Sequence, residues 1–271
     1  MSNVVEHAKP KILCLSNQKG GVGKTTTTIN LAASLQEIGA RVLVIDLDPQ
    51  GNASTGLGID RAQRKHNSFD VLTGDRSLTD TIVKSRTSGV EVVPATQDLS
   101  SIDLELSGKA DRLRRLRKAL TAPELKRYDY VLIDCPPSLN LLTLNALIAS
   151  NGVLVPLQCE FFALEGISQL LHTISEVRQL SNTDLITQGI ILTMYDQRNR
   201  LTSDVEADVR ETLGDLVLTT VIPRNVRLSE APSHGLPVLA YDPRSSGAVA
   251  YQALARELHD RVTQPEIVGR R

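Results

Sequence analysis

Cysteine is scarce in this chain, with three residues in 271, and their positions show no paired spacing. Each of them, Cys14, Cys135 and Cys159, lies in or beside an apolar run of strand length. This pattern excludes the disulfide framework of a small secreted domain. We interpret the cysteines as small core residues of a reduced, cytoplasmic protein.

Long apolar runs are absent as well. No run approaches the roughly 20 apolar residues that a membrane helix requires, and the first eleven residues carry charges and a proline where a secretion signal has an apolar core. The formal net charge is only −1, so binding of nucleic acid requires a local basic patch. The five histidines are scattered and predict no metal site.

Short apolar runs alternate with helix-like segments along most of the chain. This alternation predicts an α/β fold with a mostly parallel, twisted β-sheet that helices cover on both faces. An apolar content of 41% is ample for one core. We expect a flexible N-terminal segment at 1–10, a single folded domain at 11–262 and a flexible C-terminal tail at 263–271. Within the domain, 98–120 is predicted as a helix, 218–222 as a strand and 53–88 as a loop with short helices.

A glycine-rich loop at 18–26 joins an apolar strand to a helix, as in P-loop NTPases. Its glycines let the backbone turn N–H groups around an oligophosphate, and the following helix adds its positive end. Lys24 then reaches the outer phosphates, and the Thr25 hydroxyl becomes a magnesium ligand. The predicted phosphate site comprises Lys19, Gly20, Gly21, Val22, Gly23, Lys24, Thr25 and Thr26.

The loop departs from the standard pattern at its first position, where Gln18 replaces a glycine and a second lysine, Lys19, follows. Because Lys24 serves the phosphates of its own loop, Lys19 has no phosphate to bind unless one comes from another subunit. The run resembles the ParA family of DNA-partition ATPases, which are deviant Walker A proteins. The domain at 11–262 is then a deviant Walker A ATPase domain, and Lys19 is expected to reach the nucleotide of a partner subunit.

Carboxylates stand at the ends of apolar runs, at Asp46, Asp48 and Asp134. Ligands of open α/β sheets lie beyond the carboxyl ends of the strands, so all three are expected to point towards the phosphate site. Asp134 has the Walker B position and is expected to hold magnesium through water. Taken alone, Asp46 is equally a strand cap and Asp48 the start of an Asp-Pro turn. The ParA-like run at 46–52 implies that Asp48 orients the attacking water, beside Lys19 and Lys24 as catalytic residues.

The resemblance also implies contacts to the rest of the nucleotide. In ParA-like proteins the Pro-Arg-Asn turn lies against the adenine, which assigns Pro223 and Asn225 to that role. The family carries a run similar to 161–166 beside the nucleotide, so Glu165 is a candidate for the ribose or the partner subunit.

Arginines on two turns form the predicted DNA surface. Arg198 and Arg227 each follow a strand end and match family positions implicated in non-specific DNA binding, although ordinary surface salt bridges are the alternative. Weaker candidates for the same surface are Arg200, Arg224 and Arg244. The densest basic cluster, at 112–118, is explained as well by a helix with its leucines turned inward and its cations in water.

The resemblance implies a nucleoid-associated chromosome or plasmid partitioning ATPase that uses ATP and Mg²⁺. An ATP-bound homodimer would bind double-stranded DNA non-specifically and would be released by hydrolysis, because Lys19 makes the intact triphosphate part of the interface. Hydrolysis by the chain alone is expected to be slow, since no arginine finger is evident. Stimulation is then expected from a ParB-type centromere-binding protein.

Two other classes remain open. A MinD-like membrane-cycling ATPase would end in an amphipathic helix, and the segment 263–271 lacks the apolar residues for one. A metal-cluster carrier related to nitrogenase reductase would need a cysteine pair that bridges two subunits, for which Cys135 and Cys159 are the candidates. We also expect no DNA-reading helix-turn-helix domain before the phosphate loop.

Overall fold

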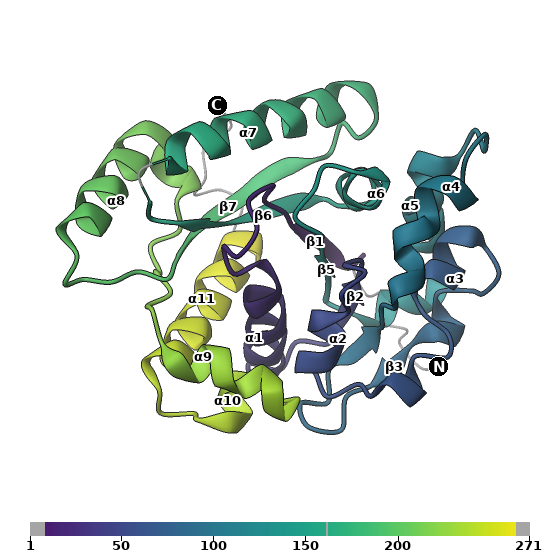
Figure 1. Cartoon of the computed structure of the whole chain (residues 1–271), viewed down its shortest axis with the longest axis horizontal. Helices are drawn as coiled ribbons and strands as arrows, with labels where there is room; N and C mark the ends of the chain where they lie inside the picture. Colours follow the sequence, from purple (N-terminus) through teal and green to yellow (C-terminus); the bar gives the residue numbers. More distant parts are fainter. Residues whose placement is uncertain (1–8, 161, 264–271) are drawn as a thin grey trace, which may run out of the picture.

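The computed structural model describes residues 9–160 and 162–263. Most of the predicted terminal segments at 1–10 and 263–271, and Phe161 within the run 161–166, therefore lie outside the described residues. The described part has the predicted architecture, a parallel sheet between two layers of helices (Figure 1).

The sheet has seven strands in the order β3-β4-β2-β5-β1-β6-β7. All neighbours pair in parallel except β3, which runs antiparallel to β4 at one edge and was not predicted. The strands are β1 (Lys11–Leu15), β2 (Val42–Asp46), β3 (Val83–Lys84), β4 (Glu91–Val93), β5 (Tyr130–Asp134), β6 (Gly152–Gln158) and β7 (Ile186–Thr193).

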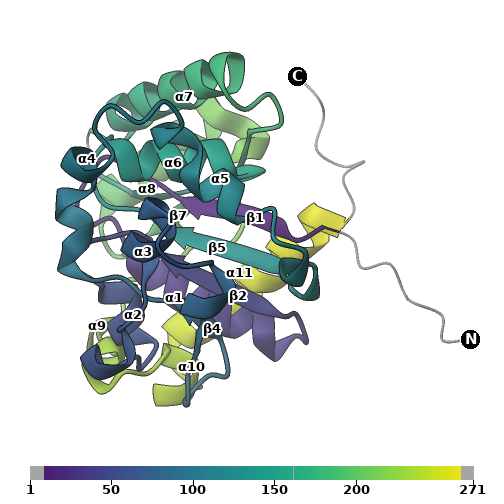
Figure 2. The same ribbon diagram turned by 90° about the vertical axis from the view of Figure 1, so that its right-hand side faces the viewer.

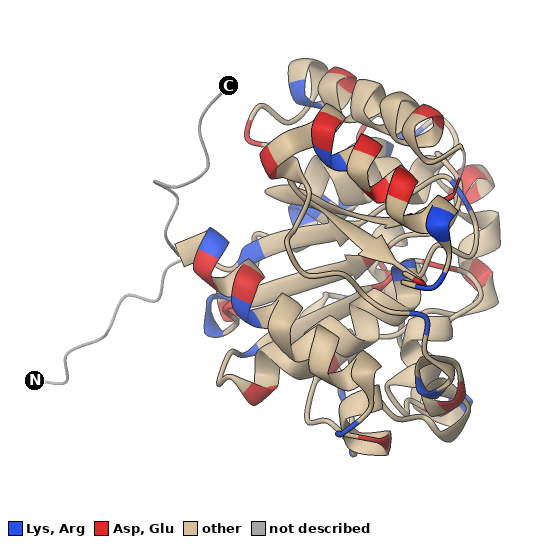
Figure 3. Ribbon diagram, turned by 90° about the vertical axis from the view of Figure 1, so that its left-hand side faces the viewer, with Lys and Arg blue, Asp and Glu red and all other residues tan. Residues whose placement is uncertain are grey.

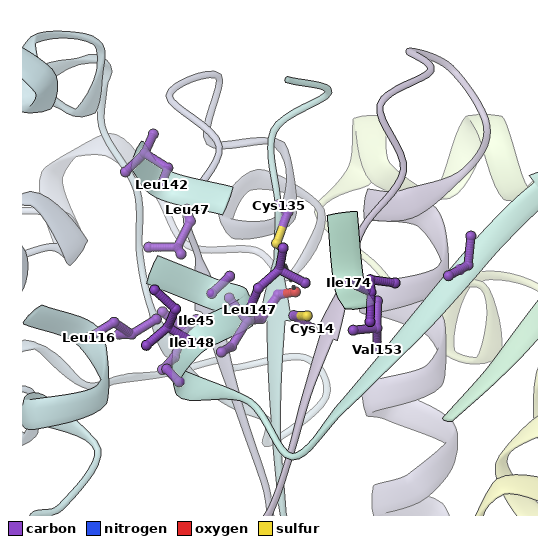
Figure 4. Packing of buried hydrophobic residues seen from close by; sticks show 14 of the residues in the cluster. Cys14, Ile45, Leu47, Leu116, Cys135, Leu142, Leu147, Ile148, Val153 and Ile174 are labelled. Carbon is purple, nitrogen blue, oxygen red and sulfur yellow. Dashed lines mark hydrogen bonds between the residues drawn. The ribbon is translucent and has the colours of Figure 1, made fainter. Parts of the chain in front are cut away.

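The central strands are continuous apolar runs because both faces of the sheet are covered; β2 and β5 are buried at every position. Successive side chains point to opposite faces, so Leu13 and Leu15 of β1 join one core cluster while Cys14 joins the other. The cluster around Cys14 is shown in Figure 4.

Helices α1, α2, α9, α10 and α11 supply the cluster on one face, and α3 to α8 supply the cluster on the other (Figures 1 and 2). Their bounds are α1 (Lys24–Glu37), α2 (Asn52–Gly56), α3 (Ser68–Thr73), α4 (Ile102–Glu105), α5 (Arg115–Ala119), α6 (Leu141–Ala149), α7 (Ala163–Leu180), α8 (Arg200–Leu213), α9 (Val226–Glu230), α10 (Val238–Tyr241) and α11 (Ser246–Thr263). The predicted α/β fold class is confirmed.

The helical stretch predicted at 98–120 is not a single helix. Gly108 has a φ of 73°, in the left-handed region, and the segment divides into the short helices α4 and α5 joined by turns. The inward leucines of the basic cluster are nevertheless confirmed, because Leu116 is buried and Leu113 and Leu120 pack partly against the core.

The strand predicted at 218–222 is also wrong. Its ends follow β7, since the N–H groups of Leu218 and Ile222 donate to the carbonyls of Ile190 and Leu192. Between them the backbone leaves the sheet, because Thr219 and Thr220 donate their N–H groups to the Glu257 carboxylate at 2.6 and 2.8 Å. In place of a ladder, isolated bridges flank the segment: Val217 pairs with Ile190 of β7, and Pro223 pairs with Tyr195 just after β7.

Candidate functional site

The glycine-rich loop follows β1 and leads into the first residue of α1, as predicted. Gly21 and Gly23 have φ values of 76° and 91°, which a residue with a Cβ rarely adopts. The hydroxyl of Thr193 in β7 donates to the Val22 carbonyl at 2.8 Å and holds the loop against the sheet. Beside the loop lies a cavity of about 350 Å³, lined by Gly20, Gly21, Gly23, Lys24, Thr25, Thr26, Asp48, Gln50, Asn52, Pro137 and Met194.

Lys24 is the lysine that lines this cavity. Its side chain is largely buried, and Nζ donates to the Lys19 carbonyl at 2.9 Å. Burial lowers the pKa of the ammonium group, while the nearby charge of Asp134 opposes that shift. A cation in this position is suited to an anionic ligand that enters from the cavity.

Asp134, at the end of β5, is the centre of a hydroxyl-lined carboxylate site. Its Oδ2 accepts a hydrogen bond from Thr25 at 2.8 Å, and its Oδ1 accepts one from Thr28 at 2.9 Å. Burial and the charges of Asp46 and Asp48 raise the pKa of Asp134 to about 8, despite these two hydrogen bonds. A bound cation would stabilise the ionised form of Asp134, which burial and the neighbouring carboxylates disfavour. A carboxylate oxygen and a hydroxyl oxygen are also suitable ligands for magnesium. The residues present therefore fit the predicted magnesium site.

Asp48 and Asp46 have different surroundings. Asp48 lines the cavity with Lys24 and Thr25, and its Oδ1 accepts the Gln50 N–H at 2.9 Å. The expectation that Asp46 also points towards the phosphates is wrong, because its carboxylate accepts the N–H and hydroxyl of Ser54 at 2.8 and 2.7 Å. Burial raises the pKa of Asp46 to about 6. Asp46 thus orders the loop that carries Asp48.

A second cavity, of about 180 Å³, continues from the first and shares Gly23, Thr26 and Met194 with it. Its other lining residues are Thr193, Ile222, Pro223, Arg224, Asn225, Leu228, Ser229 and Tyr251. The structure thus places the predicted Pro223 and Asn225 next to the phosphate loop. The Asn225 amide is engaged within the chain, since its Oδ1 accepts the Arg227 N–H at 2.8 Å and its Nδ2 donates to Ser246 at 2.7 Å.

Lys19 lies at the rim of the site and forms an ion pair with Glu160, which follows β6. Both side chains are about half exposed, at 52% and 43%. Glu165 is exposed in the first turn of α7. The lysine therefore remains accessible from outside the subunit, and its present partner is a carboxylate of its own chain.

Arg198 lies on a turn, as predicted, but the turn predicted for Arg227 is wrong, because Arg227 lies in the short helix α9, which Asn225 caps. The two segments meet, because Tyr195 and Pro223 form a bridge and the N–H of Arg224 donates to the Tyr195 carbonyl at 2.9 Å. Both arginines are exposed and paired with acids. Arg198 pairs with Asp196 at 3.1 Å, and Arg227 pairs with Glu230 at 2.7 Å and Asp242 at 3.3 Å. Figure 3 shows basic and acidic positions interspersed on this side of the molecule, in agreement with the small net charge.

The cysteines are all buried and free. Cys135 and Cys14 lie among apolar side chains (Figure 4), and burial raises the pKa of Cys159 to about 11. Thiols in these positions do not reach the surface that a cluster bridging two subunits would need, which argues against the metal-cluster class. Across 9–160 and 162–263, no helix combines the length and apolar character needed to cross a membrane.

Several residues of the site were missed in the sequence. Thr28 lies three positions after Thr25 on the same helix face, and that spacing is a usable signal. Glu160, Ser54 and Tyr251 carry no such local signal, because each reaches the site only through the fold.

Comparison with known proteins agrees with this geometry. Residues 10–187 match a family described as an AAA domain. The chain is 56% identical over 252 residues to the chromosome partitioning protein ParA of Caulobacter vibrioides, covering 93% of this chain and 94% of that protein. It is 52% identical to the sporulation initiation inhibitor protein Soj of Bacillus subtilis, covering 92% and 98%.

Solved structures of similar fold are consistent with the relatives. Cobyrinic acid a,c-diamide synthase from Mycobacterium smegmatis, with bound ADP and magnesium, has a TM-score of 0.82 at 38% identity and covers 95% of this chain and 97% of its own. The cell division ATPase MinD of Pyrococcus furiosus has a TM-score of 0.77 at 29% identity, covering 92% and 98%. The higher identity to ParA and Soj over nearly the whole length decides between these relatives: the chain belongs to the ParA family of chromosome-partitioning ATPases.

Proposed function

We propose that this ATPase binds Mg²⁺ and ATP, dimerises through the bound triphosphate, binds DNA non-specifically as the dimer and leaves DNA after slow hydrolysis. The observation that carries the proposal is the convergence of Lys24, Thr25, Asp48 and Asp134 on one side of the glycine loop. The half-exposed Lys19 stands at the rim of that same site. The similar structure that was crystallised with ADP and magnesium supports the choice of ligand.

Each residue of the cavity has a separate task in this proposal. The loop N–H groups and Lys24 bind the phosphates, and the buried position of Lys24 strengthens that attraction because little water competes. The Thr25 hydroxyl would bind magnesium directly and Asp134 would hold it through water. Magnesium would neutralise charge that develops between the outer phosphates. Asp48 would hold the attacking water with its free carboxylate oxygen.

Dimerisation follows from the position of Lys19. Its ammonium group is at the rim and its pairing with Glu160 is exposed, so the pair is weak and exchangeable. The triphosphate of a second subunit carries more negative charge than one carboxylate and would compete for Lys19. The dimer would then last only while the γ-phosphate is intact, which makes hydrolysis the release step.

DNA binding would come from Arg198 and Arg227. Arg200 and Arg224 are close to them in the sequence, and Arg244 lies on the turn after Asp242, which pairs with Arg227. One subunit offers few cations, and the dimer doubles them. Because each phosphate contact releases about 0.9 counterions, affinity rises steeply with the number of contacts. The dimer would thus be retained on the nucleoid, where the monomer is not.

Slow turnover is part of the same proposal, because rapid hydrolysis would release the ATP dimer from DNA before the bound state could persist. A ParB-type centromere-binding protein would accelerate hydrolysis and would thereby set where the dimer is released. The relatives named for chromosome partitioning support this partner.

Co-sedimentation with non-specific duplex DNA tests the proposal. The chain is incubated with ATP, with ADP and without nucleotide, each at two salt concentrations. We expect retention only with ATP, and weaker retention at the higher salt concentration. Equal retention in all three nucleotide states would contradict the proposed switch.

A second candidate is a MinD-like ATPase that cycles on membranes, which the structural similarity to MinD favours. The segment 264–271, where such proteins would carry a membrane helix, lies outside the described residues. Flotation with anionic liposomes and ATP distinguishes the candidates: recovery of the chain with the liposomes, and not with DNA, would support the membrane function.

A further inference from the structure

The turn that carries Asp48 connects β2 to α2 and is held by hydrogen bonds within itself. The Asp48 carbonyl accepts the Gly51 N–H at 2.9 Å, and its side chain accepts the Gln50 N–H at 2.9 Å. Gly51 has a φ of 64° and is the N-cap of α2. The direction of the Asp48 carboxylate therefore depends on where Gly51 and the start of α2 are fixed.

Arg64 contacts this turn from outside the phosphate loop. Its Nη1 donates to the carbonyls of Gly51 and Ala95, both at 3.3 Å. Its Nη2 donates to the Thr55 hydroxyl and to the Ile59 carbonyl, both at 2.8 Å, and Nε donates to Ile59 at 3.1 Å. The guanidinium group thus uses all of its donors on neutral acceptors, which come from the stretch 51–59 and from Ala95 after β4.

The packing around this contact is tight. A Cβ added to Gly51 would lie 2.5 Å from Arg64 Nη1 and 3.1 Å from the Ala95 carbonyl oxygen. The Thr55 hydroxyl, which accepts from Arg64, itself donates to the Gly51 carbonyl at 3.0 Å. Movement of the guanidinium group would therefore release the start of α2 and the turn before it. A lysine cannot replace this planar fork of donors.

We propose that Arg64 is a positioning residue for hydrolysis, whose guanidinium group fixes the turn that presents Asp48 to the phosphate cavity. This inference rests on the proposed role of Asp48 in hydrolysis. The side-chain hydrogen-bond partners of Arg64 belong neither to the phosphate loop nor to the lining of the phosphate cavity, and Arg64 does not line that cavity itself. Its removal is therefore expected to lower the rate of the chemical step without weakening nucleotide binding.

Arg64 is also accessible to a small molecule. Together with Arg61, Gln50 and Asp98 it lines a third cavity, of about 330 Å³, which borders the phosphate cavity at Gln50. Truncation to Arg64→Ala would enlarge this cavity around a group of unpaired carbonyls. A free guanidinium ion has the same planar set of donors and should occupy the space that the side chain leaves.

The test compares Arg64→Ala, Arg64→Lys and the control Arg61→Ala, which removes a charge from the wall of the same cavity. We expect both Arg64 variants to lower kcat at least about tenfold, with KM and the Kd for a non-hydrolysable ATP analogue changed less than about twofold. Arg61→Ala should retain the original kcat. Guanidinium ion at millimolar concentration should restore most of the kcat of Arg64→Ala, and urea at the same concentration should not.

A double-mutant cycle with Asp48→Ala separates this inference from the proposed function. If Asp48→Ala lowers kcat and Arg64→Lys lowers it no further in that background, Arg64 acts through Asp48. If the two reductions multiply, or if KM rises while kcat is unchanged, the positioning role is overturned. If Asp48→Ala itself retains the original kcat, the proposed role of Asp48 fails instead. Should Arg64→Ala not fold, Thr55→Val removes one acceptor and should lower kcat several-fold, and an unchanged kcat would overturn the inference.

Discussion

Lys19 of the phosphate loop forms an ion pair with Glu160, although 141 positions separate the two residues in the sequence. The pair closes the rim of the site with two half-exposed side chains of one subunit. An exposed pair of this kind contributes on the order of 0.5 kcal/mol to stability. Its exchange for a stronger anionic partner is therefore energetically easy.

Lys19→Ala is expected to bind ATP and to fold as the original chain does, but not to dimerise or to respond to a ParB-type protein. Sedimentation with ATP measures the dimer, and thermal unfolding checks that the free energy of unfolding is unchanged. Lys109→Ala is the matched control, because Lys109 is also an exposed lysine that faces a carboxylate, Glu105, of its own chain. A Lys19→Ala chain that still sediments as an ATP dimer would contradict the proposed interface.

Asp48→Ala is expected to keep ATP binding and dimerisation but to lower hydrolysis by at least about 100-fold, because it removes the group that holds the attacking water. The dimer should then stay on DNA after ATP is added. Single-turnover hydrolysis and the dissociation rate from DNA are the measurements. Asp103→Ala, an exposed acid in α4, controls for the change of charge; undiminished turnover in Asp48→Ala would remove Asp48 from its role.

The double variant Arg198→Ala with Arg227→Ala is expected to lose DNA retention while it still forms the ATP dimer. The slope of log K against log salt should fall by about 1.8 for each subunit, since each lost phosphate contact accounts for about 0.9. Arg114→Ala with Lys118→Ala provides the control, because these cations belong to the basic cluster of α5 and the turn before it. If the control loses DNA binding and the test variant does not, the surface lies around α5.

Stability of the ligand-free chain should fall as the pH rises towards 8. Asp134 has a pKa raised from 3.8 to about 8, so the folded chain retains this proton to a higher pH than the unfolded chain does. Protonated Asp134 therefore contributes its full stabilisation at low pH. This stabilisation is lost as the pH rises to the pKa of Asp134 in the folded chain, at up to about 1.4 kcal/mol per pH unit. Urea unfolding at pH 6, 7 and 8 measures the free energy of unfolding, and Asp134→Asn should make that free energy less dependent on pH. A wild-type slope equal to that of the variant would contradict the assigned titration.

Much of the site was predictable because it is local in sequence. The glycine loop and Asp48 follow strands, Asp134 ends one and Thr25 lies in the first turn of a helix. Parallel strands bring their carboxyl ends to one edge of the sheet, so these residues meet there. Glu160 and Ser54 were not predictable, because their roles depend on which strands become neighbours. Asp46 was wrongly predicted to point towards the phosphates, because the sequence does not reveal that the N–H and hydroxyl of Ser54 donate to its carboxylate.

The errors in secondary structure have a similar origin. Leucine spacing predicted a helical stretch at 98–120, but Gly108, in the left-handed region, interrupts it. The run 218–222 has strand-like residues, yet the Glu257 carboxylate on α11 takes the N–H groups that a strand would have given to its neighbour. In both cases a single residue, Gly108 or Glu257, prevented the regular structure that the spacing or type of several residues predicted.

The second cavity joins Gly23, near the beginning of the chain, to Tyr251 in α11. The Tyr251 hydroxyl also forms a hydrogen bond with the Thr27 hydroxyl on α1, at 3.1 Å. During synthesis, the phosphate loop therefore leaves the ribosome long before the wall of its own pocket has been translated. A nascent chain can begin to form the loop early, but it acquires the complete cavity only when its last helix has folded.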